Sequence, residues 1–332
     1  MPLVAPIDLY FFVIITIVRL TSWFPYRTVR IAVARVLGGL SYGLSRSKRA
    51  AMKRAVTAAF GGRLDDRELA RILKGSFFDL WLEVLGSKPN RIDAEATTKA
   101  RIIGWEHLEH ALAAGKGVIL WENSSFGRRF WSKQILDHNK IRVHQIHSLI
   151  HLGGLASHGE TWVRQRVIRP FFDDAERSYV TELILLPSTG NLAYGRKLLQ
   201  RLQENAVICI AGDGLTGAKT LSVPFLGAKY QFSTGMVSLA RTSGAAIVPI
   251  LCLETDDGNA SLILEEAIRV GEEDNRERQV ERIISQYAAL MECYIHRYPG
   301  SYRNWHMAAR VHDGILRKEE RLRRPHPQHH SV

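Results

Sequence analysis

The sequence predicts an α/β fold, with a mostly parallel central sheet flanked by helices and preceded by an N-terminal helical layer. Two observations support this fold class. From Arg101 onward, short apolar runs alternate with segments of helical periodicity, which is the order expected for a parallel sheet covered by helices. Before residue 100, apolar residues recur at helical spacing. With 332 residues and 46% hydrophobic content, the chain is long enough to bury a sizeable core.

The first segment, residues 7–24, is nearly continuous hydrophobic sequence of the length that can cross a bilayer. Asp8 and Arg19 interrupt it, so we expect a helix that lies along a membrane or inserts shallowly, as a monotopic or single N-terminal anchor. The alternative is an ordinary buried helix. Trp23 and Phe24, followed by basic residues, suit the headgroup boundary and favour the membrane.

The formal net charge of +12 is concentrated near the N-terminus. From Leu9 to Leu64 there is no Asp or Glu, while Lys and Arg supply ten cations. Nucleic acid and an anionic lipid surface are the two partners that such a segment can bind. Because the cations share the segment with strongly apolar helices, we expect an anionic membrane surface and no nucleic acid.

The other elements follow in order from periodicity and chain breakers. Further N-terminal helices are expected at 29–44, 47–59 and 65–85. Strands are expected at 101–103, 117–122, 142–149, 183–186, 206–211 and 245–253, with an edge strand at 261–268. Helices are expected at 106–113, 128–137, 162–173, 192–203 and 276–297, and a polar loop leads from 212 to a helix opened by Thr234-Gly235. We therefore predict a membrane-associating helical region (1–98), an α/β domain (99–312) and a flexible basic tail (313–332).

Three cysteines, Cys209, Cys252 and Cys293, are far apart in the sequence. Their spacing fits neither a zinc site nor a disulfide framework. We expect buried thiols in a reducing compartment, and no metal site.

Several phrases occur in a characteristic order: the apolar N-terminal segment, GWEHLEHALAAGKGVIL (104–120), AGDG, VPFLG and STG (211–235), and YPGSYRNWHMAAR (298–310). In this order they resemble the lauroyl/myristoyl acyltransferases of lipid A biosynthesis, within the lysophospholipid acyltransferase superfamily, over roughly Leu3 to Arg310. The resemblance implies an α/β sandwich on the cytoplasmic face of the bacterial inner membrane. It also implies transfer of a fatty acyl group from acyl-ACP or acyl-CoA to a lipid or amphiphilic acceptor, without metal or redox cofactor.

That chemistry needs a base for the acceptor hydroxyl, commonly a His oriented by a carboxylate, and donors for the thioester oxygen. The resemblance places such a His, with an acid at the fifth position after it, just beyond the strand at 117–122. The matching stretch here is NSSFGRRF, at 123–130. Aligned on Phe126-Gly127, Ser125 stands in place of the His and Phe130 in place of the acid.

Three interpretations stay open. The chain is a catalytically inactive lipid-binding relative; or its base comes from elsewhere; or Ser124 or Ser125 is an acyl-accepting nucleophile. A base from elsewhere would be found among four clustered histidines, His144, His147, His151 and His158. The catalytic candidates are Ser125, Glu122, His158 and Asp213, of which Asp213 follows a strand end or simply forms a turn.

The substrate-binding candidates lie in two places. Arg128 and Arg129 either bind phosphate at a helix start or face solvent, and Ser125 alternatively caps that helix. The resemblance implies that the second group walls the cleft and that its lysine contacts an anionic group. The second group is Lys219, Phe225, Gly227, Thr234 and Gly235.

Overall fold

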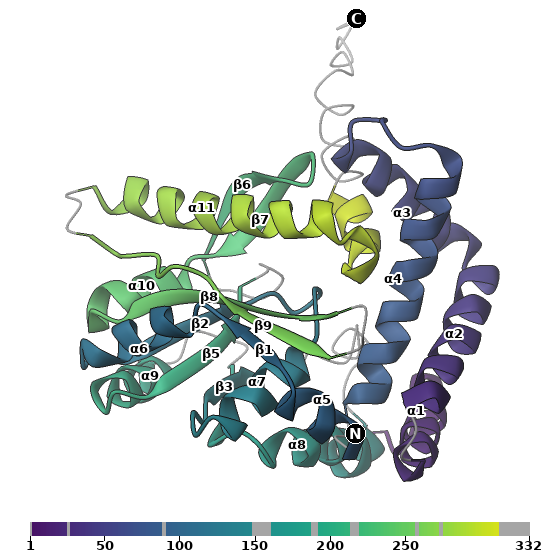
Figure 1. Ribbon diagram of the computed structural model, residues 1–332, viewed down its shortest axis with the longest axis horizontal. Coiled ribbons are helices and arrows are strands. Elements are labelled where there is room, and N and C mark those ends of the chain that lie inside the picture. The colour runs from purple at the N-terminus through teal and green to yellow at the C-terminus, as the bar shows by residue number, and fades with distance from the viewer. Residues whose placement is uncertain are drawn as a thin grey trace, which may run out of the picture.

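The computed structural model describes residues 2–24, 27–87, 91–147, 161–186, 192–212, 219–255, 259–271 and 275–311. A seven-stranded sheet forms the centre of these residues, in the order β1-β9-β8-β2-β5-β3-β4 (Figure 1). The five strands from β8 to β4 in that order run parallel, and β9 pairs antiparallel with β8. The predicted mostly parallel sheet is therefore confirmed. The strands are β1 (Arg101–Ile103), β2 (Val118–Glu122), β3 (His144–His147), β4 (Glu182–Leu185), β5 (Val207–Ala211), β8 (Ala246–Glu254) and β9 (Ala260–Leu264).

Helices cover both faces of this sheet. Strand β2 is buried along its whole length, as expected for a parallel strand covered on both sides. Ile119 and Trp121 pack into a core with α9, α10 and α11, and Val118 and Leu120 pack with α6 and α7. The helices of the α/β part are α5 (Arg91–Thr98), α6 (Trp105–Ala113), α7 (Arg129–His138), α8 (Arg169–Arg177, after a π-helical turn at Arg164–Ile168), α9 (Leu192–Gln203), α10 (Gly235–Ser243) and α11 (Arg276–Arg297).

Three elements differ from the sequence prediction. Helix α5 lies in a segment for which no element was predicted, and β9, expected as an edge strand, pairs between β1 and β8. The segment expected as a loop contains an antiparallel hairpin of β6 (Thr220–Phe225) and β7 (Ala228–Ser233). Its turn residues, Leu226 and Gly227, both have positive φ, at 50° and 74°, as a type I′ turn requires. The usual Asn-Gly signal is missing because a leucine occupies the first left-handed position. A Cβ on Gly227 would lie 3.0 Å from the Ala58 carbonyl oxygen, so the hairpin tip abuts α3.

The N-terminal layer consists of α1 (Pro6–Trp23), α2 (Arg27–Leu44), α3 (Arg46–Ala59) and α4 (Asp66–Gly86). One side of α1, including Phe11, Ile15 and Val18, packs into a core shared with α2 and α4. Among described helices, α1 is long and apolar enough to cross a membrane by length and composition, with 33% of it buried in the protein. The other side of α1 is apolar and exposed.

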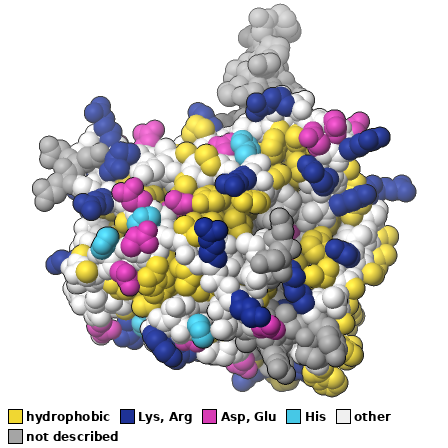
Figure 2. Space-filling view, viewed as in Figure 1, with side chains coloured by type: hydrophobic (Ala, Val, Ile, Leu, Met, Phe, Trp, Pro, Cys, Tyr) yellow, Lys and Arg dark blue, Asp and Glu magenta, His cyan; other side chains and the backbone are white. Residues whose placement is uncertain are grey.

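The exposed apolar side chains of the two helices recur at helical spacing. In Figure 2, hydrophobic side chains gather along the right-hand edge, where Figure 1 places α1 and α2. We call these residues the α1–α2 apolar face. It consists of Leu9, Val13, Leu20, Trp23, Phe24, Val36, Leu40 and Leu44.

A fully buried ion pair fixes the start of α1. The Arg164 guanidinium donates to Asp8 Oδ1 through Nε and Nη2, at 3.0 and 2.8 Å. The Thr161 hydroxyl and the Ala5 amide donate to Asp8 Oδ2, both at 2.8 Å. Asp8, which the sequence presents as an interruption of an apolar helix, therefore docks that helix on the α/β part.

Replacing Asp8 by Asn should lower the free energy of unfolding by about 3 kcal/mol or more, because Arg164 would be left buried without its counter-charge. The matched control is Asp66→Asn, which removes an exposed pair with Lys53 and should cost less than about 1 kcal/mol. Guanidinium chloride denaturation of both variants measures the difference. Equal losses in the two variants would contradict the docking role of Asp8.

Candidate functional site

The loop Asn123–Arg128 leaves β2 at the carboxyl edge of the sheet, where ligands bind in open α/β folds. Asn123 Oδ1 accepts from the Ser125 amide at 2.9 Å. The hydroxyl oxygens of Ser124 and Ser125 lie 3.5 Å apart, and both residues are half-buried. Two neighbouring hydroxyls therefore stand at the position where the resemblance expects the catalytic histidine.

Backbone contacts hold this loop from two sides. The Arg303 amide donates to the Ser125 carbonyl at 2.8 Å, and the Arg128 amide donates to the Cys252 carbonyl at 2.7 Å. Gly127 has a φ of 70°, and a Cβ there would lie 2.5 Å from the Cys252 oxygen. Only glycine fits this close approach to β8, so the loop conformation depends on Gly127.

Helix α7 starts directly after the loop. Its N-cap residue is Arg128, whose side chain makes no capping hydrogen bond. Ser125 lies three residues earlier and is therefore not the N-cap residue of this helix. The first amide of α7 that bonds within the helix is that of Ser132, to the Arg128 carbonyl, so the preceding amides lie at the positive end of the helix dipole.

A buried ionic network lies on one side of the loop, and we call it the Asp79 network. Arg303 Nη1 donates to Asp79 Oδ2 at 2.7 Å and to the Gly127 carbonyl at 2.6 Å, and its Nη2 donates to the Ser124 carbonyl at 3.1 Å. Arg128 Nη2 pairs with Asp79 Oδ1 at 2.9 Å and with Glu254 Oε2 at 3.1 Å. Burial alone would lower the pKa of Arg128, but Asp79, Glu254 and Glu83 raise it. The network consists of Asp79, Glu83, Arg128, Glu254 and Arg303.

A second ionic group, the Glu122 cluster, lies behind the end of β2. Lys133 Nζ lies 3.0 Å from Glu122 Oε2, and Arg129 Nε lies 3.3 Å from Oε1. Gln145 donates to the same Oε1 at 3.1 Å, and Glu176 lies 3.6 Å from both cations. All five side chains are buried. The cluster consists of Glu122, Arg129, Lys133, Gln145 and Glu176.

The cations of the Glu122 cluster keep the Glu122 carboxylate ionised. Burial alone would raise the pKa of Glu122, but the charges of Lys133 and Arg129 lower it below its usual 4.5. Both oxygens of Glu122 face cations, and protonating it would leave Lys133 and Arg129 undercompensated. This geometry suits an anchor for the loop better than a proton acceptor.

Arg128 and Arg129 are both buried and belong to separate ionic networks. The alternative that these two side chains face solvent is therefore wrong.

His144 is placed away from the loop. It opens β3 and pairs through Nδ1 with Glu182 Oε2 at 3.3 Å. In the strand register, His144 is level with Ile208 of β5 and Ile119 of β2. Ile119 precedes Glu122 by three residues, so His144 lies about 10 Å from the carboxyl edge of the sheet. His158 and Asp213 lie outside the described residues, as do His151 and the side chain of His147.

The second group of predicted residues lies in and after the hairpin. Phe225 is buried, with its ring against those of Tyr230 and Phe232. Thr234 precedes α10 and its amide donates to the carbonyl of the exposed Lys219 at 3.1 Å; Gly235 begins α10. An aromatic series connects the hairpin with the end of β2. It runs from Phe232 to Tyr287 at 6.4 Å and from Tyr287 to Trp121, stacked at 3.7 Å.

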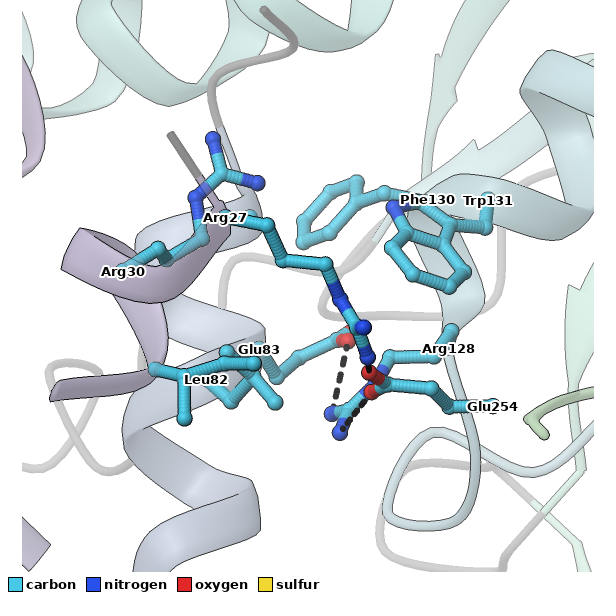
Figure 3. Close-up of a pocket in the computed structure, with 10 residues that line it drawn as sticks. Arg27, Arg30, Leu82, Glu83, Arg128, Phe130, Trp131 and Glu254 are labelled. Atoms are coloured by element: carbon cyan, nitrogen blue, oxygen red, sulfur yellow. Dashed lines mark hydrogen bonds and ion pairs between the residues drawn. The ribbon is translucent and has the colours of Figure 1, made fainter. Parts of the chain in front are cut away.

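A pocket opens between the N-terminal layer and the loop (Figure 3). Its empty space of about 420 Å³ includes open solvent at the mouth, so the enclosed part is much smaller. Figure 3 shows the guanidinium groups of Arg27 and Arg128 meeting the carboxylates of Glu83 and Glu254, with the rings of Phe130 and Trp131 on one side and the guanidinium of Arg30 pointing away. Within the described ranges, no group of three His, Cys, Asp or Glu side chains is placed to hold a metal ion. The pocket is lined by Arg27, Arg30, Ile31, Leu82, Glu83, Gly86, Arg128, Phe130, Trp131 and Glu254.

The cysteine prediction is partly wrong. Cys209 and Cys252 are buried, and burial raises the pKa of both thiols. Cys293 on α11 is exposed, because it lies on the solvent side of that helix. None of the three is disulfide-bonded.

Sequence reasoning missed most of the residues that hold the loop. Asp79 interrupts the apolar run of α4, which is the one signal that could have revealed it. Arg303 lies in the closing phrase at 298–310, but its partner is 224 positions away. Arg27, Arg30 and Glu254 carry no local signal, since they meet only through tertiary packing.

Comparison with known proteins bears on this arrangement. Residues 181–308 match the family described as bacterial lipid A biosynthesis acyltransferase. The chain is also similar to the 1-acyl-sn-glycerophosphate (LPA) acyltransferase PlsC from Thermotoga maritima, with 11% identity, a TM-score of 0.36, and coverage of 80% of this chain and 98% of that one. A search of curated proteins gave no match. The family match confirms the resemblance to lipid A acyltransferases and supports acyltransferase activity in general, although the loop precedes the matched segment.

The Glu122 cluster makes a stability prediction. Lys133→Met should lower the free energy of unfolding by about 3–5 kcal/mol, because two carboxylates would then share a single buried cation, Arg129. Adding Glu122→Gln should recover part of that loss by restoring one cation for one carboxylate. Denaturation curves of the two single variants and the double variant test this, and strictly additive losses would contradict it.

The same cluster predicts a pH dependence. Since the folded pKa of Glu122 is lowered, its contribution to stability is complete above its usual value of 4.5 and is lost as the pH falls through the folded value. Glu122→Gln should therefore be less stable at neutral pH and lose less stability on acidification than the wild type. The control is Glu95→Gln, which alters an exposed pair with Lys99. Parallel pH profiles of wild type and Glu122→Gln would refute this assignment.

Proposed function

We propose that this protein transfers a fatty acyl group from an acyl thioester, either acyl-ACP or acyl-CoA, to a hydroxyl of a lipid or amphiphilic acceptor, at the Asn123–Arg128 loop. One observation carries the proposal. The loop follows β2 at the place where the family resemblance expects the catalytic motif, and it presents two adjacent serine hydroxyls on a backbone fixed by buried ion pairs. A rigid, partly buried site is what positioning a thioester requires.

In the proposed reaction, the acceptor oxygen attacks the thioester carbonyl carbon. A C–O bond forms, the C–S bond breaks, and the hydroxyl proton ends on the departing thiol. Ser125 acts either by orienting the acceptor or by taking the acyl group first, which divides the same exchange into two steps. The amides at the start of α7 supply positive potential for the oxygen that develops charge.

Other residues have supporting parts in this proposal. Glu122 anchors the loop through Arg129 and Lys133, and His158 and Asp213 remain the proposed proton acceptors. Lys219, Phe225, Gly227, Thr234 and Gly235 remain the proposed walls of the acyl cleft, as the family resemblance implies. No metal or redox cofactor enters the proposal.

We also propose that the chain works at the cytoplasmic face of the bacterial inner membrane. The α1–α2 apolar face and the basic α3 next to it support this location. Asp8 and the packed side of α1 keep that helix on the protein, so it would lie in the bilayer surface as a monotopic anchor.

A second candidate function is lipid binding without turnover. Phe130 replaces the carboxylate of the family motif, and Glu122, the acid at the end of β2, is engaged by two cations. This observation favours an inactive relative of the transferases.

Mass spectrometry of products separates the two functions. Purified protein is incubated with acyl-CoA and acyl-ACP thioesters and total bacterial lipid. We expect a new acylated lipid whose formation falls about 100-fold or more in Ser125→Ala, since loss of a positioned catalytic group has effects of this order. His158→Ala is expected to act in the same direction.

The matched control is Ser178→Ala, an exposed serine at the end of α8, which should retain full activity. Lipid binding with no thioester consumed by the wild type would instead identify the inactive relative. Full activity in Ser125→Ala would show that the reaction does not depend on Ser125 and would contradict the proposed site.

A further inference from the structure

A second exposed apolar patch lies beside the start of α1, where the N-terminal segment meets the α/β part. Leu3 and Val4 precede that helix and are 66% and 43% exposed, and Trp162 is 48% exposed. Two backbone hydrogen bonds join the segments. The Trp162 amide donates to the Pro2 carbonyl at 3.1 Å, and the Val163 amide donates to the Leu3 carbonyl at 3.2 Å. Exposed apolar side chains from distant parts of the sequence are thereby presented together.

Both charged residues of α1 contact the α/β part. Asp8, near the start of the helix, is buried in its pair with Arg164. Arg19, near the end, lies with its guanidinium carbon 5.4 Å from the ring centre of Phe171 in α8. The two helices lie next to one another at the bottom of Figure 1. Helix α1 is therefore held along the α/β part near both of its ends and does not project from it as a spanning helix would.

Cations accompany this patch, and acids do not. Residues 161–172 contain no Asp or Glu, and Arg166 is exposed about one helical turn beyond Trp162. An exposed tryptophan next to a cation suits the headgroup layer of an anionic bilayer. Residues 9–64, which carry most of the α1–α2 apolar face, also lack Asp and Glu, so the same lipid surface fits both. We call these residues the Trp162 patch. It consists of Leu3, Val4, Trp162 and Arg166.

The Trp162 patch adjoins the α1–α2 apolar face. Leu9 of that face follows Val4 by five residues, so their Cα atoms are at most about 18 Å apart. The face continues along α1 to Trp23, and this helix of 18 residues is about 27 Å long. A flat bilayer that touches the patch at one end of α1 and Trp23 at the other runs parallel to the helix.

We propose that the Trp162 patch is a second membrane contact, through which the α/β part itself rests on an anionic bilayer next to the α1–α2 apolar face. This contact rests on the proposed membrane location and adds the α/β part to it. Trp162 and the two N-terminal side chains enter the headgroup layer, and Arg166 pairs with lipid phosphates. Contacts at both ends of α1 hold the helix parallel to the bilayer surface and fix the orientation of the α/β part above it.

Vesicle binding tests the Trp162 patch. The full-length protein is sedimented with vesicles of phosphatidylglycerol and phosphatidylcholine in equal amounts, and with vesicles of phosphatidylcholine alone. Trp162→Ser should weaken binding at least about tenfold, because roughly half of a tryptophan surface would no longer be buried in lipid. Arg166→Gln should weaken binding about fivefold, and only where phosphatidylglycerol is present.

Two matched control variants change exposed side chains at the ends of α11, which Figure 1 places in the upper half of the molecule, away from α1. Tyr298→Ser removes an exposed aromatic ring, and Arg278→Gln removes an exposed cation. Both should stay within about twofold of the wild type.

A fluorescent label shows directly whether the patch meets lipid. Gln165 is exposed and lies in sequence between Trp162 and Arg166. A label on Gln165→Cys should be quenched by phosphatidylcholine that carries a nitroxide near its headgroup. A label on Glu281→Cys, at an exposed position of α11, is the control and should stay unquenched. Both labels are placed in a Cys293→Ser background, because Cys293 is exposed and would react as well.

Four results would overturn the proposal. Equal binding of Trp162→Ser and Tyr298→Ser would confine the membrane contact to the N-terminal layer, and so would an unquenched label on Gln165→Cys in vesicle-bound protein. A dimer in lipid-free solution that Trp162→Ser dissociates would make the patch a contact between copies of this chain. Failure of the wild type to bind either kind of vesicle would overturn the membrane location together with this contact. Acyl transfer to a detergent-dispersed acceptor does not need the contact, so that assay reports on the proposed reaction alone.

Discussion

The ion pairs of Asp79 are the interaction on which the loop depends. Asp79 lies within an otherwise apolar run of α4, and its two oxygens bind Arg128 and Arg303, at 2.9 and 2.7 Å. Arg303 in turn holds the carbonyls of Ser124 and Gly127. One carboxylate thereby joins the N-terminal layer, the loop after β2 and the C-terminal segment. Removing one member of such a buried group leaves uncompensated charge, so the three parts are energetically linked.

The loop lies between this network and the Glu122 cluster, and none of its six residues is fully exposed. Arg128 and Arg129 are adjacent, yet each serves a different network. Their pairing fixes the backbone on both sides of Ser124 and Ser125. Arg128 thereby belongs both to the loop and to the lining of the pocket.

The sheet and most helices could be predicted from the sequence, because buried parallel strands and amphipathic helices have strong periodicity. The hairpin could not be predicted, because Leu226 occupies the left-handed turn position at which Asn or Gly usually marks such a turn in a sequence. The sequence suggests Ser125 as the position of the proposed site, but it does not reveal the residues that hold its loop. Asp79 and Arg303 are 224 residues apart, and only the fold brings them together.

Amide hydrogen exchange of residues 123–128 tests the central claim, that buried ion pairs of Asp79 hold the loop, most directly. In Asp79→Asn, these amides should exchange at least about tenfold faster than in wild type, while amides in the middle of β2 and β5 keep their protection, because local opening would cost about 1.4 kcal/mol less. The exposed variant Asp66→Asn on the same helix should leave the loop unchanged. Unaltered loop exchange in a folded Asp79→Asn protein would contradict this account.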